Sequence, residues 1–314
     1  MGVPARAAGL ALGYAADLAF ADPRRGHPVA GFGQLASALE RACWADDRTR
    51  GAAYTGVLVG SITVVGWAAQ RAIRGRPVPE AAMVAVATWA VLGGRSLARE
   101  GSVMAQLLET EDLLGARDRL GHLCARDATG LSANELARAS VESLAENTSD
   151  AVVAPLLWGA VAGVPGLLGY RAANTLDAMV GYRSERYLRF GWASARLDDL
   201  LNLAPARVAA ALTLAAAPLV GGRSADAWRI WRRDGARHPS PNAGPVEAAS
   251  AGALGVTIGG SNTYGGASED RGTLGDGRAV AVADLPRSVR LSQVVGFGAM
   301  LVAVALAVVR RGRG

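Results

Sequence analysis

The stretch Ala139–Arg207 reads ASVESLAENTSDAVVAPLLWGAVAGVPGLLGYRAANTLDAMVGYRSERYLRFGWASARLDDLLNLAPAR, and it decides how the chain must fold. Acids and amides stand on both sides of an almost wholly apolar segment, Ala151–Leu168, which Pro155 and Pro165 interrupt. Ionisable groups beside a segment apolar enough for a membrane are expensive to keep, and by default they mark a functional site. We therefore interpret this stretch as the site-bearing part of a membrane protein.

The composition of the chain supports this interpretation. Hydrophobic residues make up 51% and charged residues 19% of its 314 residues, against roughly 25% charged residues in ordinary soluble domains. The mean hydropathy is +0.20. The net charge is +6, but the arginines are spread through loops and form no basic run with interleaved aromatic residues. We therefore expect no nucleic-acid partner.

Six apolar stretches divide the chain. Ala52–Ala72 is long enough to span a bilayer, and with the following stretch it forms the clearest membrane hairpin. The Pro and Gly breaks near residue 165 are tolerated at membrane depth only where protein or water covers the freed backbone. The six stretches are Gly2–Phe20 (a retained first helix), Ala52–Ala72, Ala81–Gly94, Ala151–Leu168, Ala204–Val220 (interrupted by Arg207 and Pro218) and Leu291–Val309.

The positions of the polar blocks restrict the topology. If all six stretches crossed the membrane, the block at Asn174 would lie opposite those at Glu146 and His238, and one site cannot be assembled across a bilayer. If Ala151–Leu168 and Ala204–Val220 are re-entrant or surface-lying, all blocks face one side. We predict an all-α, polytopic integral membrane protein with about four full crossings, re-entrant or surface helices and a Gly-rich polar loop region. It forms a single membrane-embedded domain over residues 1–314.

A helix is predicted before the broken apolar segment. Ser132 and Glu135 have the spacing of a capping box, and the helix that they start should run to about Asn147. Spacing by four places Glu142 and Glu146 on one face, with Asp150 one turn further. Carboxylates are hard oxygen ligands, and magnesium is usually held by one or two of them together with substrate phosphates. Solvated acids paired with arginine are the alternative interpretation for each of them.

Two further features are candidates for chemistry. His238 lies between turn residues, where a histidine serves as a general base, as a ligand or only in packing the turn. The segment Gly255–Gly266, GVTIGGSNTYGG, has enough glycine to present backbone N–H groups to a phosphate, although an ordinary flexible turn has the same composition. It is not a P-loop, because the chain contains no lysine. The three histidines are not closely paired, so zinc is not expected.

Several of these blocks, in this order, resemble the CbiB/CobD family of cobalamin-biosynthesis membrane proteins, the adenosylcobinamide-phosphate synthases. The resemblance covers most of the chain, from Asp22 to about Tyr264. One small departure is Ala151, where the family pattern leads us to expect glycine. The matching blocks are Asp22-Pro23 with His27-Pro28, ESLAENTSD (142–150), YRAANTLDAMVGY (170–182), Arg186-Tyr187 with Phe190-Gly191, ARLDDLLNLAP (195–205), SPNAGPVE (240–247) and GALGVTIGGSNTYGG (252–266).

The resemblance implies a multi-pass enzyme of the cell membrane that works late in corrin assembly. It would join adenosylcobyric acid, the corrinoid substrate, to (R)-1-aminopropan-2-ol or its O-phosphate through an amide, using ATP and Mg²⁺. Because the corrinoid acid and ATP are cytosolic, the motif loops should face the cytoplasm. We also expect association with other enzymes of cobalamin assembly.

Site residues follow from the matched blocks. Glu146, Asp150, Asp177 and His238 are the candidate catalytic residues, with His238 as a general base toward the amine. Glu146, Asp150 and Asp198 are the candidate metal ligands. Arginine suits both phosphate and carboxylate groups. The candidate substrate- and nucleotide-binding residues are Asn147, Asn174, Arg183, Arg186, Asn242, Gly259, Gly260 and Asn262.

Two other functions compete with the enzyme. Broken helices with charges at membrane depth are typical of transporters, and a transporter for a corrinoid or another small molecule is the main alternative. No inverted repeat is visible in the sequence, however, and the polar blocks lie mostly between the apolar stretches. A membrane sensor or scaffold would not need so many acids and amides in separate blocks.

Overall fold

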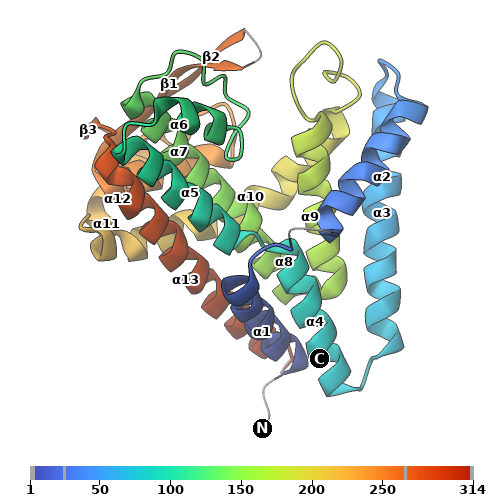
Figure 1. Ribbon diagram of the computed structural model, residues 1–314. Helices are drawn as coiled ribbons and strands as arrows, with labels where there is room; N and C mark the ends of the chain where they lie inside the picture. Colours follow the sequence, from blue (N-terminus) through green and yellow to red (C-terminus); the bar gives the residue numbers. More distant parts are fainter. Residues whose placement is uncertain (1–3, 24–25, 265–266, 312–314) are drawn as a thin grey trace. The chain divides into compact units, whose positions relative to one another are not determined.

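The computed structural model of the protein describes residues 4–23, 26–264 and 267–311, and for residues 261–264, 267–270 and 311 it describes the backbone alone. Helices dominate, as predicted (Figure 1). In chain order the elements are α1 (Ala5–Phe20), α2 (Pro28–Cys43), α3 (Arg48–Ala72), α4 (Pro77–Val91), α5 (Gly94–Glu109), α6 (Leu113–Leu120), α7 (Ala133–Thr148), the π-helical turn η1 (Ser149–Val153), α8 (Ala154–Ala162), α9 (Val164–Val180), α10 (Trp192–Ala216), the 3₁₀ turn η2 (Ala217–Val220), α11 (Ser224–Asp234), α12 (Ala243–Leu254), β1 (Val256–Tyr264), β2 (Ala267–Leu274), β3 (Arg278–Ala279), the 3₁₀ turn η3 (Val282–Asp284) and α13 (Leu285–Arg311).

The chain divides into two compact units, each assembled from separate segments. Unit 1 comprises Met1–Gly93, Ala154–Asn202 and Ala299–Gly314, and unit 2 comprises Gly94–Val153 and Leu203–Gly298. Two of the boundaries fall inside helices, α10 and α13. No linker or change of composition marks them in the sequence, and the single domain over residues 1–314 stays a prediction.

Unit 1 is a set of packed helices. In it α1 lies beside α4, and α3 lies beside α9 (Figure 1). Its buried core includes Tyr54 of α3 and Phe190, whose rings are 5.1 Å apart. Gly51, one turn before Tyr54, packs directly on the backbone of Phe190, so that a Cβ at this position would overlap the Phe190 carbonyl. The close approach of α3 to this loop therefore requires glycine.

We expect Gly51→Ala to lower the free energy of unfolding by about 2–3 kcal/mol, because the atoms that it would meet are backbone atoms that cannot rotate away. A Cβ on Gly56 of the same helix would have no neighbouring atom within 4 Å. Gly56→Ala should therefore stabilise by about 0.5–1 kcal/mol through helix propensity. Denaturant unfolding of the two variants in detergent micelles measures both effects. Equal changes in the free energy of unfolding for Gly51→Ala and Gly56→Ala would contradict the packing at Gly51.

Unit 2 combines helices with a small sheet. In it α5 packs on α7, and α11 packs on α12. β1 pairs antiparallel with β2 and parallel with β3, in the order β2-β1-β3. The expectation of a Gly-rich polar loop is therefore wrong for most of Gly255–Gly266, because Val256–Tyr264 is a strand; residues 265–266 lie outside the described part. The run Val256-Thr257-Ile258 is β-branched and favours strand.

Four helical stretches are long and apolar enough to cross a membrane: Arg48–Ala72, Pro77–Glu109, Trp192–Val220 and Val282–Arg310. Their number agrees with the predicted four crossings, but the set differs. The first helix, α1, has 16 residues, about 24 Å at 1.5 Å per residue, against a hydrocarbon core of about 30 Å. Among the described residues it does not meet the criteria for a span.

The stretch Ala204–Val220 was expected not to cross, and it lies within a helical stretch that is long and apolar enough to do so. The helix α10 begins at Trp192, inside the preceding polar block, and continues through Pro205. Together with η2 it gives 29 residues. The interruption of the apolar run by Arg207 did not end the helix, because a single arginine fits within a helix and Pro218 falls in the 3₁₀ turn that closes it. The other doubtful stretch, Ala151–Leu168, is split at Gly163 between α8 and α9, and neither qualifies as a span.

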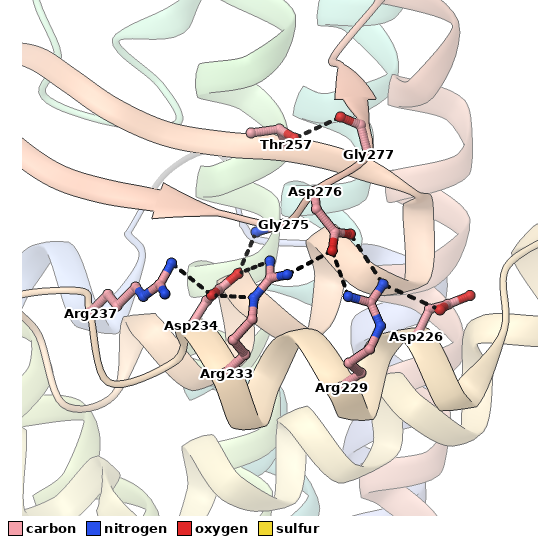
Figure 2. A network of polar contacts seen from close by, with 9 residues as sticks. All are labelled: Asp226, Arg229, Arg233, Asp234, Arg237, Thr257, Gly275, Asp276 and Gly277. Carbon is pink, nitrogen blue, oxygen red and sulfur yellow. Dashed lines mark hydrogen bonds and ion pairs between the residues drawn. The ribbon is translucent and has the colours of Figure 1, made fainter.

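Ion pairs join α11 to the turn after β2 in unit 2. Figure 2 shows Asp234 and Asp276 holding Arg229, Arg233 and Arg237. The Asp234 side chain is fully buried. It accepts two hydrogen bonds from Arg233, at 2.8 and 2.7 Å, and one from the backbone N–H of Gly275 at 2.9 Å. These contacts fix the end of α11 against the β2–β3 turn.

We expect Asp234→Asn to lower the free energy of unfolding by about 2 kcal/mol at neutral pH, since hydrogen bonds to charged groups are lost. The hydrogen bonds from Arg233 hold the pKa of Asp234 below its ordinary value. Its stabilisation is therefore present above the unfolded-state pKa of about 3.9 and is lost as pH falls through the lower folded-state pKa. The difference between wild type and variant should shrink below about pH 4.

The partly exposed Asp226 of the same helix gives the control. Asp226→Asn should change the free energy of unfolding by no more than about 0.5 kcal/mol at either pH. Unfolding titrations at neutral and acidic pH measure both variants. A penalty for Asp234→Asn that does not depend on pH would contradict the ionic role of this carboxylate.

Candidate functional site

The helix α7 carries the acids of the candidate site in unit 2. It starts as predicted, with Ser132 as N-cap and a complete capping box with Glu135. It ends at Thr148, and Asp150 lies in the π-helical turn that follows. Glu142 is buried, Glu146 one turn later is partly buried, and Asp150 is partly buried. The predicted common face of Glu142 and Glu146 is confirmed, since both act on the same neighbours.

Glu142 is held from two sides. Its Oε2 pairs with the guanidinium of Arg126, and the two side chains are only 4% and 3% exposed. Its Oε1 accepts the backbone N–H of Gly259 at 2.8 Å. An ion pair buried to this extent is retained only when its remaining polar atoms are also satisfied. Glu142 therefore fixes the β hairpin and the loop before α7 to one point of the helix.

The hairpin approaches α7 through its glycines. Gly259 and Gly260 have φ angles of 84° and 83°, which favour glycine, and the register of β1 and β2 shifts between Gly259 and Ser261. A Cβ on Gly259 would overlap the Gly272 carbonyl of β2. The Gly259 carbonyl accepts a hydrogen bond from Arg138. The N–H of Gly259 thus donates to Glu142, and its carbonyl accepts from Arg138. The Gly259 N–H therefore already has a hydrogen-bond partner within the protein.

His238 and Glu247 form the least satisfied part of the site. Glu247 lies in α12, every residue of which is buried. The side chains of His238 and Glu247 are each 1% exposed, and His238 Nε2 lies 3.8 Å from Glu247 Oε1. Neither that nitrogen nor either Glu247 oxygen has a hydrogen-bond partner among the described residues. His238 Nδ1 accepts the Ser240 backbone N–H at 3.0 Å, which places the proton of the neutral ring on Nε2.

Burial dominates the electrostatics of this cluster. It lowers the pKa of His238 to about 4, and the charge of Arg271 acts in the same direction. It raises the pKa of Glu146, which Arg271 opposes. It also raises the pKa of Glu247, together with the negative charges of Glu142 and Glu146. At neutral pH His238 is therefore uncharged, and burial favours the neutral form of Glu247.

The other predicted residues of unit 2 lie around this cluster. Asn147 donates to the carbonyls of Ser143 at 2.9 Å and Leu123 at 3.4 Å, so it ties α7 to the preceding loop. Asn242, at the start of α12, accepts from Arg207 at 3.0 Å. The side chain of Asn262 lies outside the described residues, although its backbone pairs with Glu269.

Unit 1 holds a second polar cluster, built from the block that follows the broken apolar segment. Asp198 of α10 accepts from Asn174 of α9 at 3.3 Å and from Asn202 at 3.0 Å. Asn202 also accepts from the Tyr170 hydroxyl at 2.9 Å. Asp198 and Asn202 are buried. Asn174 and Asp198 are thus brought together as predicted, and they lie in a different unit from Glu146 and Asp150.

The remaining predicted residues lie near the end of α9. Asp177 is partly buried in the last turn of α9 and packs on Gly181. Arg183 is exposed in the loop that follows. Arg186 pairs with Glu40 of α2 at 2.9 Å and lies 4.6 Å from the ring centroid of Trp44. Arg186 therefore joins this loop to α2, and half of its side chain remains exposed.

Among the residues that the structure describes, no group of three or more His, Cys, Asp or Glu is arranged to hold a metal ion. Glu146 and Asp150 nevertheless supply two carboxylates one turn apart, and magnesium usually keeps several waters and shares phosphate ligands with its substrate. Two carboxylates alone do not form a closed metal cage.

Sequence reasoning passed over the partners that complete the cluster. Glu247 was noted only as part of a matched block, and Arg126 and Arg271 were not chosen at all. Glu247 did have a signal, because it is the single charged residue of the segment Ala243–Leu254. A lone acid in an apolar segment is costly to bury and marks a site by default. Arg126 and Arg271 had no such signal in the sequence, since their pairing depends on the packing of loops and strands that are distant in sequence.

The fold and site together define a polytopic helical membrane protein with a buried cluster of carboxylates, arginines and a neutral histidine. A family model described as CobD/Cbib protein matches residues 10–292. The chain is 55% identical over 306 residues to "Cobalamin biosynthesis protein CobD" of Mycobacterium tuberculosis, covering 98% of this chain and 97% of that one. It is also 47% identical over 265 residues to the protein of that name from Geobacter metallireducens, covering 83% of each chain.

A third relative of the same name, from Chromobacterium violaceum, is 44% identical over 284 residues, covering 88% of each chain. No solved structure matches. The chain belongs to the CobD/CbiB family of cobalamin biosynthesis proteins.

Proposed function

We propose that the protein is an enzyme that uses ATP to form an amide between adenosylcobyric acid and (R)-1-aminopropan-2-ol or its O-phosphate. The observation that carries the proposal is the buried cluster of unit 2, in which Glu142, Glu146 and Glu247 face Arg126 and Arg271. Such a set of opposed charges under burial is costly to maintain, and perturbed acids of this kind gather at functional sites. The family supplies the pathway, cobalamin biosynthesis, and its relatives bear that name.

The chemistry requires an activated carboxylate. A carboxylate and an amine do not condense at neutral pH, so the acid is first phosphorylated by ATP and the amine then displaces phosphate from the acyl phosphate. Glu146 and Asp150 are our candidates to hold the magnesium that neutralises charge on the nucleotide phosphates. Arginines would stabilise the negative charge on the transferred phosphoryl group, and Arg183 and Arg186 are exposed enough to reach a ligand.

The remaining candidates keep supporting roles in this proposal. Asn174, Asp177 and Asp198 would bind polar groups of the corrinoid, and Asn147, Asn242, Gly260 and Asn262 would orient the nucleotide. The expected location is the cell membrane, with the motif loops on the cytoplasmic side, where ATP and the corrinoid acid are found. Association with other cobalamin-assembly enzymes belongs to the same proposal.

The proposal is tested with the full chain purified in detergent. Adenosylcobyric acid, aminopropanol O-phosphate, ATP and magnesium are supplied, and the amide product and ADP are sought by mass spectrometry. We expect product in the complete mixture and none when ATP is left out, with the free amine run in parallel. Folded protein that forms no amide with either amine would contradict the ligase and favour a transporter of a corrinoid or another small molecule.

A further inference from the structure

One feature of unit 2 is unexplained by its own contacts. Glu247 is 1% exposed, and both of its carboxyl oxygens lack a hydrogen-bond partner among the described residues. Leaving a buried polar group unsatisfied costs about 1–3 kcal/mol, and more if the group is charged. Native proteins keep few such groups, and each one calls for an explanation, such as an absent ligand. The helix around Glu247 is wholly buried, and Ser250 is its only other polar side chain.

The groups that face Glu247 decide what such a ligand would be. They are Glu142 and Glu146 of α7, Arg126 from the loop before α7, Arg271 of β2, and His238. Arg138 is nearby in sequence, but its guanidinium donates to the Gly259 carbonyl. Three carboxyl groups thus face two guanidinium groups, and Arg126 is already paired with Glu142. When all three carboxyl groups and both guanidinium groups are ionised, the cluster has a net negative charge. A ligand that neutralises this charge would be a cation.

The neighbouring ring limits the kind of cation. Because Nδ1 of His238 accepts the Ser240 N–H, its Nε2 carries the proton and faces Glu247 Oε1 at 3.8 Å. A divalent metal ion would need several oxygen ligands, and no three acidic, histidine or cysteine side chains in the described part of the chain are arranged to supply them. A protonated Nε2 also cannot coordinate a metal. A primary ammonium group needs only hydrogen-bond acceptors, and Oε2 of Glu247 is one.

We propose that Glu247 is the binding site for the primary ammonium group of the amine substrate, beside His238, whose Nε2 lies 3.8 Å from the other carboxyl oxygen. This inference rests on the proposed function, because the aminopropanol is the amine in question. Burial and the charges of Glu142 and Glu146 raise the pKa of Glu247, so a bound cation would favour its ionised form. Binding of the ammonium would then displace a proton from Glu247 to the buffer, with no other reactant needed.

The test measures binding of two probes to the full chain by isothermal titration calorimetry. The first is (R)-1-aminopropan-2-ol O-phosphate, and the second is isopropyl phosphate, which lacks only the amine. We expect wild type to bind the first at least about tenfold more tightly, since a charged hydrogen bond of about 1.5 kcal/mol or more is at stake. Titration in two buffers with different ionisation enthalpies should show proton release with the amine probe alone.

Two variants complete the design. Glu247→Gln keeps the size of the side chain and should bring the preference for the amine probe to about one, with no proton release and unchanged affinity for isopropyl phosphate. Ser250→Ala, one turn along α12, is the matched control and should keep the preference. If Glu247→Gln fails to fold, the wild-type measurements still decide, because equal affinity for both probes without proton release overturns the inference.

The outcomes separate this inference from the proposed function. If the amine is preferred in a Glu247-dependent way but no amide forms, the ammonium site stands and the ligase does not. If amide forms while Glu247→Gln leaves both the preference and the KM for the amine unchanged, the ligase stands and the ammonium site is wrong.

Discussion

Glu142→Ala should lower the free energy of unfolding by about 3–5 kcal/mol, the largest stability effect that we expect from a single substitution in this chain. The Arg126 side chain is 3% exposed, and the substitution removes the carboxylate that offsets its charge. The same change takes away the acceptor of the Gly259 N–H. A buried charge and a buried donor would thus lose a partner at once, and α7 would lose its connection to the hairpin.

Denaturant unfolding of the purified protein in detergent measures this effect. Glu135→Gln is the control, because Glu135 is exposed on the same helix and glutamine preserves the capping box. Removing both charges, as in Glu142→Leu with Arg126→Met, should be less harmful than Glu142→Ala alone, since an apolar pair replaces an ion pair. If the double variant were as unstable as the sum of its single changes, charge compensation would not be the reason for the loss.

Glu146→Gln should lower kcat of the proposed ligation by about 100-fold or more, the size of effect seen when one group that stabilises transition-state charge is removed. Glu146 lies one turn after Glu142 on α7, with its charge opposed by Arg271 and Arg126. Glutamine keeps the shape of the side chain and removes the negative charge that would hold magnesium. Because Glu146 is only partly buried, we expect the fold to survive.

Steady-state kinetics and unfolding are measured on the same preparations. The result that supports the role is a low kcat with a free energy of unfolding close to that of wild type. Glu135→Gln again serves as the control and should keep full turnover. Turnover of Glu146→Gln near the wild-type rate would exclude Glu146 from the reaction, whatever the fate of the other acids.

The helical architecture was accessible from the sequence because the signals were local. Apolar runs predicted the long helices, and the spacing of Ser132 and Glu135 predicted where α7 begins. The full length of the helix around Ala204–Val220 was not predicted, because helix continuity depends on the residues before the apolar run. Helix α10 begins at Trp192, and its polar first half hid the full length from a search for apolar windows.

The hairpin was missed for a different reason. Glycine is typical of loops, and the high glycine content of Gly255–Gly266 outweighed the β-branched residues at its start. In the structure Gly259 allows the close approach of β1 to the Gly272 carbonyl of β2, and the register of the two strands shifts just after it. Both features are compatible with a strand. Strand pairing also depends on β2, and a single stretch of sequence does not reveal its partner.

The candidate site was predictable only in part. Glu142 and Glu146 share a helix, so spacing alone placed them together. The approach of Glu247 and His238 to these acids depends on how α12 and the preceding loop pack, which no spacing encodes. Asn174 and Asp198 lie 24 residues apart and meet through a hydrogen bond between the side chains of α9 and α10.

The interleaving of the two units has a consequence for synthesis of the chain. Unit 1 takes its segments from both ends of the chain, and its last segment begins at Ala299. A ribosome therefore cannot release a finished unit 1 before almost the whole polypeptide has been translated. Unit 2 lacks only Leu203–Gly298 once the middle of unit 1 has been made. Unit 2 can thus be complete before unit 1, although unit 1 contains the first residues to enter the membrane.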